Sequence, residues 1–181
     1  MNIHFDSNSV HNSNVYDGAS NKFLFNLDTP ISLGSGTTTI TNVDRDVVAV
    51  WDRRAFGRDK VTIRGEERYM VDWMDTPNIF GSSRRFTAPD GKSYTWKTRE
   101  AASSLKLVDD RSGRTVAKAH NAHHVFGPRA MSIDFDPSLA QILDALVLSF
   151  VICEHKRRAR GRSRGDGGAM AGTGAAGGGA M

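Results

Sequence analysis

The segment Leu139–Cys153, LAQILDALVLSFVIC, decides the fold, and it runs directly into EHKRRARGRSRG at positions 154–165. Its only polar residues are Gln141, Asp144 and Ser149. A fifteen-residue helix spans about 22 Å, whereas a bilayer core is about 30 Å thick. Asp144 would also cost about 2.5–3.5 kcal/mol in the middle of a membrane. We therefore expect this helix to be buried inside protein and not to cross a membrane.

The start of the helix has a clear sequence signal. Asp136 is a favourable N-cap residue, and Pro137 suits the first helical position, where a missing N–H costs nothing. We expect the core helix to span residues 137–157. A helix that is apolar on nearly all sides must be surrounded by other elements.

The preceding residues supply candidate strands. Short runs rich in β-branched and aromatic residues, separated by turn signals, are typical of an all-β domain. The two clearest hairpins are RRFTAPDGKSYTWKT at 84–98 and SLKLVDDRSGRTVAKA at 104–119, in which Gly91 and Gly113 supply the positive φ that closes each turn. The other candidate strands lie at 3–5, 15–16, 22–27, 37–43, 47–53, 60–64, 67–73 and 130–135.

These patterns predict a mainly β domain in residues 1–160. We expect a closed antiparallel barrel of about twelve strands around one C-terminal hydrophobic helix, because a barrel of that size has interior room that its own side chains do not fill. Two alternatives stay open: a tail-anchored membrane protein, and a helix lying against one face of an open sandwich.

Several motifs resemble a known superfamily. They are FLFNLDTP, TTTITNV, VAVWDRR, FTAPDGKSYTWK, SLKLVDDRSGRTVAKAH and SIDFDPSLAQILDALVLSFVICEHKRR. Over roughly residues 3–160 the chain resembles a fungal family of uncharacterised domains near the tubby C-terminal, LURP-one and phospholipid-scramblase-like superfamily. That resemblance implies a core helix threaded through the barrel. It implies no activity, and the phosphoinositide-binding residues of tubby domains have no counterpart in this sequence.

Charge is concentrated at the C-terminal end of the sequence. Residues 1–153 hold 18 basic and 18 acidic residues, and the net charge of +4 comes from the residues after them. We expect residues 161–181, an Arg/Gly stretch and then a Gly/Ala-rich stretch, to be a disordered tail. Cys153 is the single cysteine, and the first residues have no secretory pattern. Both features favour an intracellular protein, cytoplasmic or nuclear, and we expect a monomer.

Catalytic motifs are lacking in the sequence. Three imidazoles in HNAHH, at His120, His123 and His124, could ligate a metal, but no carboxylate or cysteine follows at ligand spacing, which favours a polar loop. Trp51, Trp73 and Trp96 suit a core or barrel rim better than a sugar-stacking platform. We expect no enzyme activity, no cofactor and no metal.

Two arginine-rich segments are candidate ligand-binding sites. WDRRAFGRD holds Arg53, Arg54 and Arg58 around Phe56, and SSRRF holds Arg84 and Arg85. They would form a phosphate-binding patch if both lay at one mouth of the barrel, and otherwise they are solvated loops. A third segment could bind RNA or anionic membrane weakly, or could simply end an apolar helix in solvent. Its basic residues are Lys156, Arg157, Arg158, Arg160, Arg162 and Arg164.

Three functions remain open from the sequence. The first is a non-catalytic β-barrel module that binds a protein or a lipid head group, such as a phosphoinositide, through its loops. The second is a polyanion binder that uses the Arg-rich C-terminal segment. The third is a metal-dependent enzyme that uses the His cluster.

Overall fold

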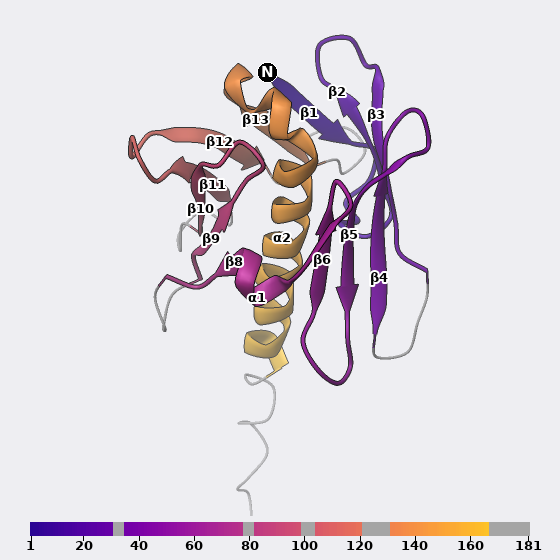
Figure 1. Cartoon of the computed structure of the whole chain (residues 1–181), viewed down its shortest axis with the longest axis vertical. Coiled ribbons are helices and arrows are strands. Elements are labelled where there is room, and N and C mark those ends of the chain that lie inside the picture. Colours follow the sequence, from indigo (N-terminus) through magenta and orange to yellow (C-terminus); the bar gives the residue numbers. More distant parts are fainter. Residues whose placement is uncertain (31–34, 78–81, 99–103, 121–130, 167–181) are drawn as a thin grey trace, which may run out of the picture.

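A single antiparallel sheet wraps around one long helix in the computed structural model, which describes residues 1–30, 35–77, 82–98, 104–120 and 131–166 (Figure 1). The strands before the short helix α1 are β1 (Asn2–Phe5), β2 (Ser13–Asp17), β3 (Phe23–Asp28), β4 (Gly36–Thr41), β5 (Val47–Arg53), β6 (Lys60–Ile63) and β7 (Glu66–Tyr69). They are followed by α1 (Met70–Trp73), β8 (Met74–Asp75), β9 (Arg84–Thr87), β10 (Ser93–Thr98), β11 (Leu105–Asp109), β12 (Thr115–His120) and β13 (Ser132–Phe135). A 3₁₀ helix, η1 (Pro137–Ile142), leads into α2 (Leu143–Asp166).

The mainly β architecture is confirmed, and the closure of the barrel is not. The described strands form one 13-stranded sheet in the order β7-β6-β5-β4-β3-β2-β1-β13-β12-β11-β10-β9-β8. β1 joins the two halves by pairing with both β2 and β13. β7 and β8 remain edge strands, so hydrogen bonds do not close the sheet.

The short helix α1 explains why the two edges do not pair. A strand was expected over residues 67–73, but β7 ends at Tyr69 and one helical turn follows. Met70 and Trp73 are both buried, a spacing of three that suits a helix and not a strand. The indole N–H of Trp73 donates to the Thr87 carbonyl at 3.0 Å, so this turn is attached to the opposite edge of the sheet. A cleft of about 330 Å³ runs along the seam.

The C-terminal helix starts where the sequence predicts, but as a 3₁₀ turn. The Asp136 carboxylate caps it by accepting from the Ser138 amide at 3.0 Å, and Pro137 follows. The regular α-helix begins at Leu143 and reaches Asp166, nine residues beyond the expected end at 157. Residues 161–166 of the expected tail are therefore helical, and 167–181 lie outside the described residues.

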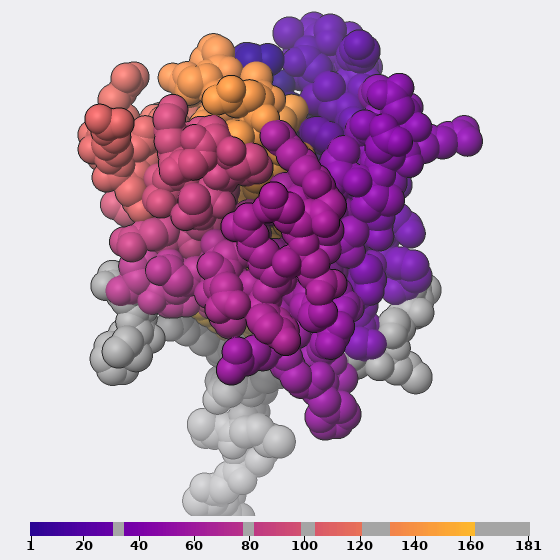
Figure 2. Space-filling model, in the orientation of Figure 1, coloured from indigo at the N-terminus to yellow at the C-terminus, as the bar shows by residue number. Residues whose placement is uncertain are grey.

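Burial accounts for the apolar character of this helix. Residues Pro137–Gly161 are long and apolar enough to cross a bilayer by length and composition alone, but 72% of the most apolar window is buried. The strands hide most of α2 in the space-filling view (Figure 2). A transmembrane role is therefore not indicated for the helix that the structure describes.

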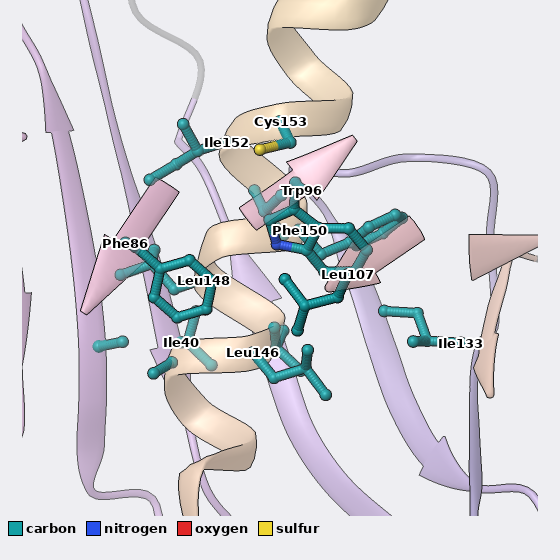
Figure 3. Packing of buried hydrophobic residues seen from close by; sticks show 14 of the residues in the cluster. Ile40, Phe86, Trp96, Leu107, Ile133, Leu146, Leu148, Phe150, Ile152 and Cys153 are labelled. Atoms are coloured by element: carbon teal, nitrogen blue, oxygen red, sulfur yellow. The ribbon is translucent and has the colours of Figure 1, made fainter. Parts of the chain in front are cut away.

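The core forms around the middle of α2. Leu146, Leu148, Phe150 and Ile152 project from the helix toward side chains of the surrounding strands (Figure 3). The indole N–H of Trp96 donates to the Ser149 hydroxyl at 2.9 Å, and that hydroxyl donates to the Leu146 carbonyl, also at 2.9 Å. The Trp96 indole and the Ser149 hydroxyl therefore both have hydrogen-bond partners inside the core.

All three tryptophans belong to this core. Trp51, Trp73 and Trp96 are no more than 5% exposed, which confirms the prediction of core positions and leaves no surface platform for stacking on a sugar ring.

Candidate anion-binding site

Strand alternation brings two of the predicted arginines to one end of the sheet. In β5 the inward side chains are Ala49 and Trp51, so Arg53 is the next inward position and the last of the strand. In β9 the buried Phe86 points inward, so Arg84 is the first inward residue of that strand. β5 and β9 run in opposite directions, so β5 ends and β9 begins at the same end of the sheet. Arg53 and Arg84 therefore face the same opening. We call this the basic end; in Figure 1 it is the lower end, where α2 emerges.

The helix adds two more cations at the basic end. Lys156 and Arg160 are separated by four residues, so they lie on the same face of α2, one turn apart. The same face carries Cys153 one turn earlier, and Arg84 lies close enough to influence both Cys153 and Lys156 electrostatically. We call Arg53, Arg84, Lys156 and Arg160 the basic cluster.

Burial destabilises the charged forms of Arg53, Arg84 and Lys156, and neighbouring positive charge adds to this for Arg84 and Lys156. The pKa of Lys156 is lowered chiefly by burial and then by the positive charge of Arg84. The pKa of Arg84 is also lowered by burial, with Arg160 adding to the effect. Burial likewise lowers the pKa of Arg53, and Asp59 partly offsets this. A bound anion would relieve both penalties, because it supplies the opposite charge and hydrogen-bond acceptors.

Arg84 has an unused donor at this place. Its Nε is buried and has no hydrogen-bond partner among the described residues, while one terminal nitrogen donates to the Thr76 hydroxyl at 2.7 Å. A buried donor left without an acceptor costs about 1–3 kcal/mol. Thr76 therefore holds Arg84 in position, while no described protein group accepts a hydrogen bond from the Nε of Arg84.

Arg53 is fixed by different contacts. Its Nε donates to the Gly36 carbonyl at 3.2 Å, and its guanidinium lies over the ring of Trp51 at 5.0 Å. Both contacts leave the guanidinium at the rim of the opening, where the Asp59 carboxylate partly offsets the lowering of its pKa.

The remaining predicted arginines lie elsewhere or are already paired. Arg85 projects from the outer face of β9 and pairs with Asp110 at 3.0 Å. Arg54 pairs with Asp52 at 3.0 Å, and Arg58 lies over the Tyr69 ring at 5.7 Å. Arg54 and Arg58 belong to the β5–β6 connection at the basic end, and both are exposed.

Two of the C-terminal cations have a structural role. Glu154 is 1% exposed and accepts from Arg157 at 2.6 and 2.7 Å and from Arg158 at 2.7 Å. Arg158 also donates to the Asn8 carbonyl at 2.6 Å, which attaches the helix to the loop after β1. The side chains of Arg162 and Arg164 lie outside the described part of the chain.

A histidine pair that no sequence pattern indicates lies beside the cluster. His11 Nε2 and His155 Nδ1 are 2.7 Å apart, although 144 positions separate the residues. Burial, together with the nearby positive charge of Arg53, lowers the pKa of His11 to about 4. The His11 ring is therefore expected to be neutral at pH 7.

Nucleophilic and metal chemistry find little support here. Burial raises the pKa of the Cys153 thiol to about 12, so the thiol stays protonated and unreactive. His120 lies on β12 with Nε2 2.7 Å from an Asp134 carboxylate oxygen, and His123 and His124 fall outside the described residues. Within the described ranges no three His, Cys, Asp or Glu side chains gather as a metal site would require.

Some of these positions could have been found from sequence patterns. Period-two alternation with Phe86 predicts that Arg84 points inward, and Glu154 with Arg157 and Arg158 has helical ion-pair spacing. The proximity of Lys156 to Arg84 has no local signal, because it depends on how the sheet wraps around the helix.

Comparison with known proteins gives a family and no activity. Residues 8–159 match the family described as "Family of unknown function (DUF6593)". No curated protein matches the sequence. Among solved structures, an X-ray structure of a protein from Arabidopsis thaliana is similar with a TM-score of 0.46 and 12% identity, covering 81% of this chain and 87% of that one.

Proposed function

Because the chain belongs to the DUF6593 family, whose function is unknown, we propose a function from its geometry: a non-catalytic binding module that holds a phosphate-bearing ligand at the basic cluster. One observation carries the proposal. Arg84 presents a buried, unused donor beside Lys156, and burial and neighbouring positive charge lower the pKa values of both residues.

Phosphate fits this arrangement better than a single carboxylate does. A phosphate monoester carries up to two negative charges and three acceptor oxygens, so it can accept from arginine and lysine together. Arg84 supplies a planar guanidinium, and Lys156 supplies a compact charge on a flexible stem. The phosphorylated head group of a phosphoinositide, which we expected from the sequence as one possible ligand, carries this chemistry.

The absence of catalysis is part of the proposal. The groups described beside the basic cluster include the protonated Cys153 thiol, the Asp59 carboxylate and the His11–His155 pair, whose ring nitrogens are already bonded to each other. Such a set can hold an anion, but it lacks an activated nucleophile with a general base positioned against it.

The fold supports a distant relation to the tubby C-terminal, LURP-one and phospholipid-scramblase-like superfamily. Its antiparallel sheet surrounds one hydrophobic C-terminal helix, and Trp73 of α1 connects the two edges through its bond to Thr87. We propose that the domain behaves as a barrel whose last seam is sealed by side-chain packing. No ligand-binding residue is transferred on this basis, since fold is a weak guide to function.

Two neighbouring arginines provide a matched test. Inorganic pyrophosphate should raise the melting temperature of the full chain and shift the amide resonances of residues 84 and 156, because a ligand that binds only the folded state stabilises it. Arg84→Gln should remove most of this effect. Arg85→Gln deletes the same charge one residue away, on the outer face of β9, and should retain it. Equal loss in both variants, or no pyrophosphate response in the unmodified chain, would refute the proposal.

A further inference from the structure

The connection between β5 and β6 exposes an aromatic side chain at the basic end. Phe56 is 95% exposed, between Arg54 and Arg58, and Gly57 follows with φ +105° at the tip of the turn. This connection extends from the lower end of the molecule, beside the C-terminal end of α2 (Figure 1). A fully solvated phenylalanine forgoes most of the free energy that its burial would provide.

Other apolar side chains accompany Phe56. The amide of Met70 donates to the Asp59 carbonyl at 2.8 Å, so the start of α1 lies against the end of the β5–β6 connection. Tyr69 and Val71, on either side of Met70, are 44% and 51% exposed. Phe56, Tyr69 and Val71 are thus half of the exposed large hydrophobic residues that the structure describes, and they share one end of the molecule.

The cations at this end are arranged around those apolar groups. Arg58 and Lys60 both lie over the Tyr69 ring, at 5.7 and 5.9 Å. The basic cluster opens at the same end, where the apolar and basic groups together resemble the composition of interfacial membrane anchors. Asp72, exposed on α1 beside Val71, opposes this attraction, and Asp52 is already paired with Arg54.

We propose that the basic end docks on the surface of an anionic lipid bilayer, with Phe56 inserted among the head groups and Tyr69 and Val71 beside it. This inference rests on the proposed function, since the basic cluster would then receive a lipid phosphate. A bilayer suits the geometry because Phe56 projects from a convex turn flanked by arginines, and a negatively charged, deformable surface accommodates both features. Each cation near such a surface contributes to attraction that decays within a Debye length.

Vesicle sedimentation tests the proposal directly. The full chain should bind vesicles of phosphatidylcholine with phosphatidylserine, and it should bind pure phosphatidylcholine vesicles much more weakly. Phe56→Ser should weaken binding at least about tenfold, from the lost burial of one aromatic ring. Val47→Ser is the matched control, because Val47 is 55% exposed at the start of β5, the opposite end of that strand. Asp72→Asn should strengthen binding. Equal loss in the Phe56 and Val47 variants, or equal binding to both kinds of vesicle, would overturn the inference.

A second measurement locates the inserted side chain. Trp51, Trp73 and Trp96 are buried, so a tryptophan introduced at position 56 would be exposed to solvent and its fluorescence would respond to contact with lipid. Phe56→Trp fluorescence should shift to shorter wavelength with anionic vesicles and be quenched by brominated lipid, and Val47→Trp fluorescence should do neither. An unchanged Phe56→Trp signal on bound protein would show that another face docks.

Pyrophosphate binding separates this inference from the proposed function. Phe56→Ser should bind pyrophosphate as the unmodified chain does, since Phe56 is not part of the basic cluster. If pyrophosphate binds through Arg84 but vesicles do not bind, docking is wrong and the phosphate site stands. If neither binds, both proposals fail.

Discussion

Glu154→Gln should destabilise the domain more than any surface ion pair could. Glu154 is 1% exposed, and its two carboxylate oxygens accept from Arg157 and Arg158 at 2.6–2.7 Å. The substitution keeps the shape of the side chain but removes its charge, and it turns an N–H₂ group toward a guanidinium. Arg158 also bonds to Asn8, so part of the attachment between α2 and the loop after β1 is weakened as well.

The magnitude follows from burial. Removing one partner of a fully buried ion pair costs about 3–5 kcal/mol. Both arginines are 26% exposed, so water can partly solvate them after the change, and we expect a loss of about 2–3 kcal/mol. For a domain of this size that loss lowers the melting temperature by roughly 5–10 °C.

Calorimetry and urea denaturation at neutral pH would measure this loss. Glu67→Gln is the control, because Glu67 pairs with Lys60 but is 56% exposed, and such pairs contribute about 0–1 kcal/mol. Arg157→Met combined with Glu154→Gln should cost less than the sum of the single changes, since the two residues share one interaction. A melting temperature of Glu154→Gln within error of the Glu67→Gln value would refute the reasoning.

Two further predictions concern the helix. Leu146→Ala removes a completely buried side chain and should cost about 2–5 kcal/mol in urea denaturation, whereas Leu146→Asp should fail to fold; a folded Leu146→Asp variant with unchanged melting would exclude a buried helix. The lowered pKa of His11 means that the unfolded chain takes up a proton before the folded chain does, so stability should be complete above pH 6.5 and decrease as the pH falls from 6.5 toward 4. His11→Asn should flatten this decrease and His120→Asn should not; identical profiles for the two variants would contradict it.

Much of the fold could be predicted because it depends on local patterns. Asp136 and Pro137 mark the helix start, and Gly91 and Gly113, with φ of +76° and +69°, close the two hairpins as expected. The burial of α2 follows from its composition, since so apolar a segment needs a surrounding wall. Membership of a fungal or tubby-related group, in contrast, rests on resemblance and stays a prediction.

The errors arose where tertiary contacts decide the structure. The run at 67–73 looks like a strand, but burial of Met70 and Trp73 on one side turns its second half into α1 and leaves the sheet without hydrogen-bonded closure. The helix extends past residue 157 although glycine is present at 161, where helix propensity alone would favour an end.

The candidate site was only partly visible in the sequence. Alternation along β5 and β9 could have separated Arg84 from Arg85, and placed Arg53 at the inner rim. The positions of Lys156 and of the His11–His155 pair at the site can be predicted only if the register between α2 and the surrounding sheet is known. That register is set by core packing over many residues and has no signature of its own.

The pairing of β1 with both β2 and β13 has a consequence for biosynthesis. Among the described strands β1 is translated first, yet its second neighbour β13 and the helix that fills the interior follow only after β12. Until then Phe5, Trp51 and Trp96 lack the helix that buries them, and contacts between such distant residues form slowly. During translation the nascent domain therefore exposes the apolar inner face of its sheet. Its yield in cells should depend on chaperones that bind such apolar surfaces until α2 has been translated.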